Sequence, residues 1–189
     1  MAVPGRFGDH ARLSSRARAS LLAAVAVALL AGLVLLQYGP GDHPLIKDRA
    51  YFVYLGQALL RGEDIYHVTF WGYPPLAPLL TAGVIGLAEP FGVASWMAPR
   101  LAGVAVGCLC VAAMFLVTRN ALRSVYAGVL AGILLAGFGQ LGRFSVASLE
   151  PKMLVVLFSL ATCLALQKRR PALAGFTSLP TVSCSRWTT

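Results

Sequence analysis

The sequence predicts an all-α, polytopic helical membrane protein. Apolar residues fill 58% of its 189 positions and charged residues only 12%, whereas a typical soluble domain carries about 25% charged residues. Four apolar segments approach the length of about 20 residues that a helix needs to cross a bilayer. These segments are residues 20–37, 95–118, 121–140 and 152–167. We therefore expect about four transmembrane helices.

The first apolar segment has two possible interpretations, a cleaved signal peptide or an uncleaved membrane helix. Several arginines precede it, as they would in a signal peptide. However, the segment is long, and the residues that follow it, Leu36–Pro40, do not form a small-x-small cleavage site. We therefore expect an uncleaved first transmembrane helix.

A fifth apolar segment, Leu76–Ala88, decides the topology. It is bounded by prolines and by Glu89-Pro90, and a helix of this length rises only about 20 Å against a hydrocarbon thickness of about 30 Å. If it does not span, the N-terminal arginines, Arg119 with Arg123, and residues 168–170 all fall on one side, which the positive-inside rule makes cytoplasmic. The N-terminus is then cytoplasmic. The loops that lie outside are residues 38–94 and 141–151.

The first external loop is predicted to contain two juxtamembrane helices. Asp48 can cap a helix from about Arg49 to Arg61, which Gly62 then ends. The second helix is Leu76–Ala88, because the prolines before it are tolerated at the start of a helix. The loop therefore lies on the membrane surface rather than crossing it.

The net charge of +9 does not indicate a nucleic-acid partner. The basic residues mostly flank apolar segments and form no basic stripe, and membrane lipids are the expected surroundings. The four cysteines match no zinc or redox spacing. The composition therefore argues against a nucleic-acid-binding protein and against a cysteine-ligated metal site.

Two acidic residues at the outer boundary are the main site candidates. Asp48 follows the first predicted span, and Glu150 lies where the last one begins. A carboxylate there could act as a general base towards a hydroxyl, and Arg143 or Lys152 could bind a phosphate. Asp48 could equally be an N-cap alone, and Glu150 could be a first-turn residue favoured by the helix dipole. Tyr51 and Tyr73, in the first external loop, are further substrate-binding candidates.

The loop sequence resembles that of a known enzyme family. The stretches "DRAYFVYLGQALLRGEDIY" and "YPPL" resemble the first external loop of GT-C type membrane glycosyltransferases, which include protein O-mannosyltransferases and the lipid A aminoarabinose transferase. Phe91-Gly92, Arg100-Leu101 and Glu150-Pro151 follow in the order typical of that group. The resemblance covers about residues 20–175.

The resemblance implies an enzyme of the bacterial inner or plasma membrane. It would move a sugar from a polyprenyl-phosphate-linked donor to a hydroxyl of a lipid, glycan or protein on the external side. Asp48 matches the catalytic acidic position, which acts as general base, and Glu150 matches the second acidic position. In some members the second position helps to hold a divalent metal ion, and no other cofactor is implied.

The sequence also departs from the family, whose members have eight or more spans. Residues 1–175 correspond to the N-terminal part of the family's transmembrane module. Residues 176–189 are expected to be an aberrant or disordered tail from a truncated or frameshifted gene. The alternative is a non-catalytic multi-pass membrane protein, such as a transporter subunit or assembly partner. A transporter would place ionisable residues within its spans, and none is expected in the span interiors here.

Overall fold

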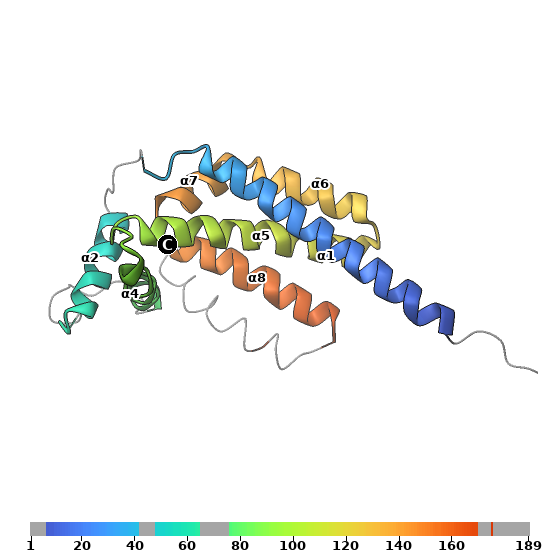
Figure 1. Cartoon of the computed structure of the whole chain (residues 1–189), viewed down its shortest axis with the longest axis horizontal. Helices are drawn as coiled ribbons and strands as arrows, with labels where there is room; N and C mark the ends of the chain where they lie inside the picture. Colours follow the sequence, from blue (N-terminus) through green and yellow to red (C-terminus); the bar gives the residue numbers. More distant parts are fainter. Residues whose placement is uncertain (1–6, 42–47, 65–75, 170–174, 176–189) are drawn as a thin grey trace, which may run out of the picture.

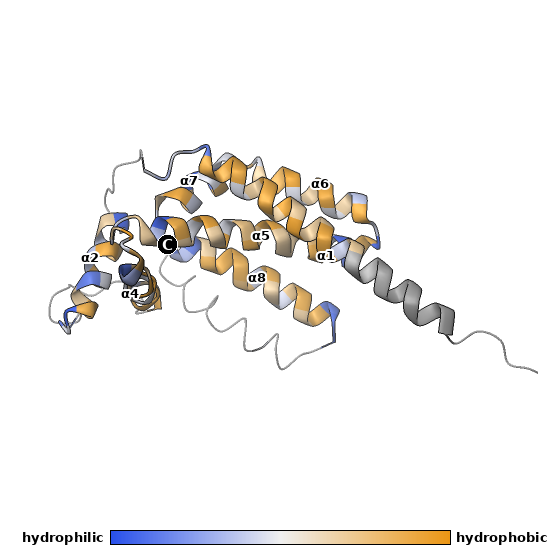
Figure 2. Ribbon diagram, viewed as in Figure 1, coloured by the Kyte–Doolittle hydropathy of each residue, from blue (hydrophilic) through white to orange (hydrophobic). Residues whose placement is uncertain are grey.

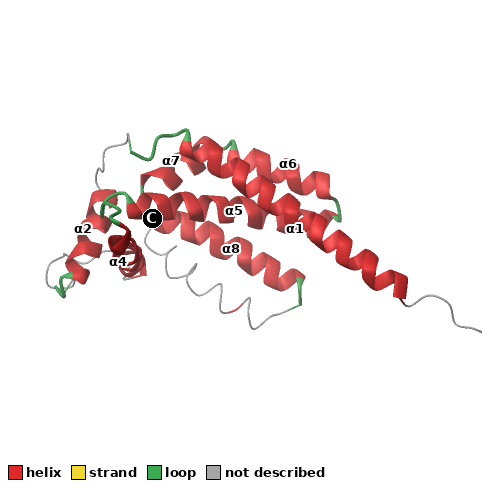
Figure 3. Cartoon of the chain, in the orientation of Figure 1, coloured by secondary structure: helices red, strands yellow, loops and turns green. Residues whose placement is uncertain are grey.

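Helices make up every regular element in the described part of the chain (Figure 3). The structure is a computed structural model that describes residues 7–41, 48–64, 76–169 and Gly175, with the backbone alone for residues 7–18 and Asp48. The all-α class is therefore confirmed for these residues, while Tyr73 and the predicted tail at 176–189 lie outside them. The helices are α1 (Phe7–Leu36), α2 (Asp48–Leu60), α4 (Leu76–Ala88), the short 3-10 helix η1 (Glu89–Phe91), α5 (Ala98–Leu122), α6 (Val125–Ala136), α7 (Gly139–Ala147) and α8 (Pro151–Gln167).

The long helices form a bundle and the loop helices form a lobe at one end of it (Figure 1). Helix α5 lies at the centre and contacts α1, α6, α7 and α8. Helices α2 and α4 pack on each other, and α4 contacts α5. The lobe, the C-terminal end of α1 and the N-terminal ends of α5 and α8 therefore lie at the same end of the bundle (Figure 1).

Two helices are long and apolar enough to cross a membrane. They are the Ala19–Leu36 part of α1 and the whole of α5; α6 and α7 provide a third span if the bent pair is counted as one. Hydrophobic residues predominate along these helices (Figure 2), and Leu22, Leu109 and Leu134 are among those whose side chains are exposed. A helical surface that is apolar all round is typical of a membrane span. The described part of the chain thus has two or three candidate spans.

The predicted count of about four spans is not confirmed. It requires α8 to be a fourth span, and α8 is shorter than the 18 residues of the shorter candidate span, Ala19–Leu36. Helix α8 has 17 residues and rises about 25 Å at 1.5 Å per residue. It is apolar along its length and packs against α5. Its length leaves it below that of the two long candidate spans.

The predicted span at residues 121–140 is wrong at both ends. Helix α6 begins at Val125 and ends at Ala136, and the chain bends by 63° before α7 begins. Residues 141–147, predicted to lie in the second external loop, belong to helix α7 instead. The Gly137-Phe138-Gly139 sequence explains the break, because glycine is a poor helix former and Phe138 is extended (φ −72°, ψ 108°).

The two helices of the first loop follow the predicted boundaries closely. Helix α2 ends at Gly62, which takes the left-handed conformation (φ 76°), and the Glu63 N–H donates to the Ala58 carbonyl over 3.0 Å. This is the glycine-terminated helix end that the sequence predicts. Helix α4 spans Leu76–Ala88, as expected, and Gly56 of α2 lies directly against Thr81 and Ala82 of α4.

Candidate functional site

Glu150 is held at the start of α8 by the proline that follows it. Pro151 occupies the first helical position and keeps Glu150 extended (φ −76°, ψ 139°). The Glu150 carbonyl accepts the first turn's hydrogen bond from the Met153 N–H over 3.0 Å. Its side chain makes no capping hydrogen bond to α8. Glu150 is therefore the residue before the helix, not part of its first turn, and its carboxylate is available for another partner.

That partner is Arg49 of α2. The Arg49 Nε donates to the Glu150 Oε1 over 2.8 Å, across 101 positions of the chain. The two side chains are 26% and 11% exposed, so the pair is shielded from most of the solvent. The ion pair joins the start of α2 to the start of α8.

The same contact places the backbone of Asp48 near Glu150. Asp48 is the first residue of α2 and directly precedes Arg49, so the Cα atoms of these two neighbours are about 3.8 Å apart. The two acidic positions chosen from the sequence thus lie at the same end of the bundle. The pairing of Glu150 with Arg49 was missed, because charge complementarity over 101 residues leaves no local pattern.

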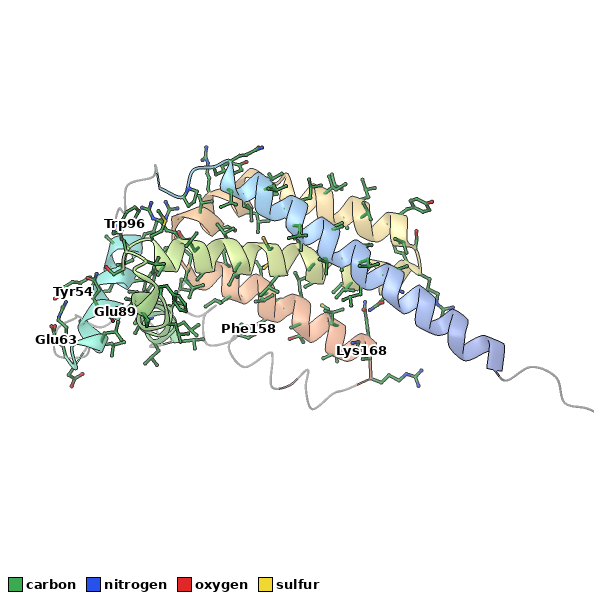
Figure 4. All side chains as sticks on the ribbon, in the orientation of Figure 1. Tyr54, Glu63, Glu89, Trp96, Phe158 and Lys168 are labelled. Carbon is green, nitrogen blue, oxygen red and sulfur yellow. The ribbon has the colours of Figure 1, made fainter. Side chains whose placement is uncertain are left out.

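A second arginine, Arg100, is buried at this end of the bundle. It lies in the first turn of α5, is 2% exposed and donates from Nη1 to the Pro40 carbonyl. Its guanidinium stacks 5.1 Å from the centroid of the Trp96 ring, which Figure 4 shows at the junction of the lobe and the bundle. Arg49, paired with Glu150, and Arg100, bound to the Pro40 carbonyl, are thus two arginines at this end of the bundle.

Arg100 lies at the start of the second span, where the sequence predicted it. It is the third residue of the candidate span Ala98–Leu122 and the one charged residue of the apolar segment 95–118. A buried cation in such a helix needs acceptors nearby, and ionisable residues in membrane helices commonly mark functional sites.

The wall between α5 and α7 is polar next to this cluster. Ser145 and Ser148 are fully buried, and neither hydroxyl has a hydrogen-bond partner among the described residues. Gly103 of α5 lies against the carbonyls of both serines. On the lobe side, Gln57 donates to the Ser95 hydroxyl over 2.6 Å and fixes α2 to the segment before α5. The cluster is therefore held by contacts from α2, α5 and α7.

The remaining predicted site residues lie around the cluster rather than in it. Arg143 is exposed on α7, and Lys152 is exposed in the first turn of α8. The Lys152 ammonium lies 5.4 Å from the centroid of the Phe144 ring. Tyr51 is half-buried on α2. The arginine that the structure pairs with Glu150 is Arg49, and phosphate binding by Arg143 or Lys152 stays a prediction.

The described side chains do not provide the ligands that a divalent metal prefers. Hard cations take six or more oxygen ligands, with carboxylates prominent among them. No group of three or more His, Cys, Asp or Glu side chains lies together in the described part of the chain. Glu150 Oε1 is already bound by Arg49. Among the described side chains, the charged groups at this end of the bundle include the guanidinium groups of Arg49 and Arg100 and the carboxylate of Glu150.

A double-mutant cycle measures how strongly the ion pair joins α2 to α8. For Arg49→Met and Glu150→Gln we expect a coupling free energy of about 1–3 kcal/mol in equilibrium unfolding in detergent micelles, because a hydrogen bond between charged groups is stronger than a neutral one and this pair is largely shielded. The pair Arg61–Glu63, at 2.5 Å, provides the control, since its side chains are 52% and 37% exposed.

For the control variants Arg61→Met and Glu63→Gln we expect no resolvable coupling, because solvent and salt screen exposed charges. Equal coupling in the two cycles would show that the Arg49–Glu150 contact does not hold the lobe to the bundle.

The cluster combines features suited to chemistry on an anionic substrate. Two guanidinium groups can bind a phosphate, and a carboxylate beside them can bind or deprotonate a hydroxyl. Arg100 lies at the start of the candidate span α5, and Arg49 and Glu150 lie at the starts of α2 and α8 at the same end of the bundle. Comparison of the chain with models of protein families, with curated proteins and with solved structures found no match.

Proposed function

We propose that the protein is a membrane glycosyltransferase of the GT-C type. It transfers a sugar from a polyprenyl-phosphate-linked donor to a hydroxyl of a lipid, glycan or protein at the external face of the membrane. The observation that carries the proposal is the ion pair between Arg49 and Glu150. It joins the helix that begins with Asp48 to the end of the bundle where Arg100 is buried.

The proposed topology has four spans and a cytoplasmic N-terminus. The spans are α1, α5, the bent pair α6–α7, and α8. Basic residues at the end of the bundle opposite the cluster support this orientation, because basic residues gather on the cytoplasmic side. Lys168 lies there, far from Trp96 and Glu63 (Figure 4). The other basic residues at this end are Arg119, Arg123 and Arg169.

In the proposed reaction the Asp48 carboxylate takes the proton from the acceptor hydroxyl. The hydroxyl oxygen forms a bond to the anomeric carbon of the sugar, and the bond from that carbon to the phosphate oxygen breaks. The electron pair of the broken bond leaves with the polyprenyl phosphate, whose negative charge Arg49 and Arg100 stabilise. Glu150 orients Arg49 through their 2.8 Å contact. No metal ion takes part in this scheme.

Sealed membrane vesicles test both the activity and its side. Right-side-out vesicles that contain the protein, given a panel of water-soluble short-chain polyprenyl-phosphate sugars and a hydroxyl acceptor, are expected to release polyprenyl phosphate. Inside-out vesicles are expected to do so only after detergent opens them. Vesicles without the protein provide the background. If no donor of the panel is consumed in opened vesicles, the proposed function is wrong; release from intact inside-out vesicles alone would reverse the topology.

A further inference from the structure

A second polar site lies at the opposite end of the bundle from the Arg49–Glu150 pair. A pocket of about 500 Å³ opens where α5 ends and α6 begins, beside the start of the apolar part of α1. Three segments contribute to its lining, which consists of Ala19, Ser20, Arg119, Asn120, Arg123 and Val125. The glycosyltransferase scheme uses none of these residues.

The charge of the pocket is positive. Arg119 and Arg123 both line it, and the lining contains no acidic residue. The Arg119 Nη1 donates a hydrogen bond to the Asn120 Oδ1 over 3.4 Å, and this partner is neutral. Ser20 and Asn120 add polar groups that can bind phosphate oxygens. Two guanidinium groups with neutral polar neighbours form a site for an anion.

Backbone groups reinforce this positive potential. The pocket reaches Val125, the first residue of α6, a helix of 12 residues whose N-terminal end carries partial positive charge. Arg123 ends α5 in the left-handed conformation (φ 52°, ψ 28°), where glycine is the usual residue. Arg123 therefore lines the pocket in a backbone conformation that is strained for arginine and would not be strained for glycine.

The position of the pocket along the candidate spans favours a lipid ligand. Ala19 is the first residue of the candidate span of α1, and Leu122, next to Arg123, is the last residue of the α5 span. The pocket therefore lies where the spans leave the hydrocarbon, at the level of lipid headgroups. Exposed apolar side chains lie beside it, including Leu21, Leu22 and Leu122, and acyl chains can pack along them.

We propose that this pocket binds the headgroup phosphate of an anionic phospholipid. Basic pockets between membrane helices recognise such headgroups, and each basic residue near the surface contributes about 1 kcal/mol of attraction. The bland interpretation of Arg119 and Arg123 is that they only set the topology, as boundary arginines do. If the arginines only set the topology, removal of either one should change lipid binding no more than removal of another basic residue at the same end of the bundle. This difference separates the two interpretations.

The test uses the purified protein in nanodiscs of phosphatidylcholine mixed with phosphatidylglycerol. Native mass spectrometry of the released protein measures which lipids remain bound. The wild type is expected to retain phosphatidylglycerol in preference to phosphatidylcholine. Arg119→Gln and Arg123→Gly are each expected to weaken this preference about fivefold, the factor that corresponds to the loss of one basic residue. Glycine also relieves the strain at position 123, so this variant is expected to remain folded.

Lys168→Gln is the matched control. It removes one positive charge at the same end of the bundle, from an exposed residue that does not line the pocket, and it is expected to preserve the preference. An equal loss in Lys168→Gln, or no lipid preference in the wild type, would overturn the proposal. Displacement of phosphatidylglycerol by inorganic phosphate would also overturn it, because it would identify a site for a small soluble anion.

Discussion

Replacement of Asp48 by asparagine is expected to lower the rate of sugar transfer by about 100- to 10,000-fold, the usual contribution of a general base. Asparagine is close in size to aspartate and keeps a capping oxygen, so α2 is expected to keep its start at residue 48. The substitution therefore removes the carboxylate with little change to the start of the helix. Initial rates of polyprenyl phosphate release measure the effect, and thermal unfolding of the same sample checks that the fold is kept.

The control for this prediction is Asp64→Asn, which makes the same charge change in the same loop. Asp64 is exposed and follows α2 beyond Gly62, at the opposite end of that helix from Asp48. We expect it to retain the wild-type rate. Full activity of Asp48→Asn would refute the general-base role and leave Asp48 as a cap alone. Equal losses in both variants would point to the net charge of the loop rather than to one carboxylate.

The parts of the fold that were predicted correctly have local causes. Gly62 ends α2 because it can take a positive φ, and Glu89-Pro90 ends α4 because proline cannot continue a regular helix. The break between α6 and α7 was missed, because Gly137, Phe138 and Gly139 carry no charge and do not interrupt an apolar segment, although α7 itself is less apolar than α6. Hydropathy reports where the chain is apolar, whereas the bend depends on backbone preferences at two glycines.

The candidate site was predictable only in its acidic members. Asp48 and Glu150 were chosen because acids are rare in this chain and these two flank apolar segments. Arg49 and Arg100 act through tertiary contacts, Arg49 with Glu150 and Arg100 with the Pro40 carbonyl. Such contacts depend on how α2 and α5 pack against the rest of the protein. Local sequence patterns carry no information about this packing. Arg143 and Lys152 were chosen for their positive charge and their closeness in sequence to Glu150. Their side chains are exposed on α7 and α8.

The packing that holds this cluster together depends on a glycine seam on α5. Gly103 and Gly107, one helical turn apart, face α7. A Cβ atom added at Gly103 would meet the backbone carbonyl of Ser145 and lie 2.7 Å from that of Ser148. Backbone atoms cannot turn aside as a side chain can, and small residues are what allow membrane helices to approach so closely. Since Glu150 follows Ser148 by two residues, any displacement there also moves the carboxylate that binds Arg49.

Gly103→Ala is accordingly expected to destabilise the fold by about 1–3 kcal/mol, the usual cost of overpacking. This corresponds to a fall of about 2–12 °C in the melting temperature, measured in detergent micelles. Gly107→Ala is expected to cost less, because its added Cβ would meet side-chain atoms that can move, the Ser145 Oγ at 2.5 Å and the Leu35 Cδ1 at 2.8 Å.

Gly83→Ala supplies the opposite expectation with the same chemical change. Gly83 lies inside α4 with nothing within 4 Å of an added Cβ, so alanine is expected to raise the stability slightly, by up to about 1 kcal/mol through helix propensity. From the highest melting temperature to the lowest, the predicted order is therefore Gly83→Ala, wild type, Gly107→Ala and Gly103→Ala. If Gly103→Ala has the same melting temperature as Gly83→Ala, then α5 and α7 do not make the close contact on which the position of Glu150 depends.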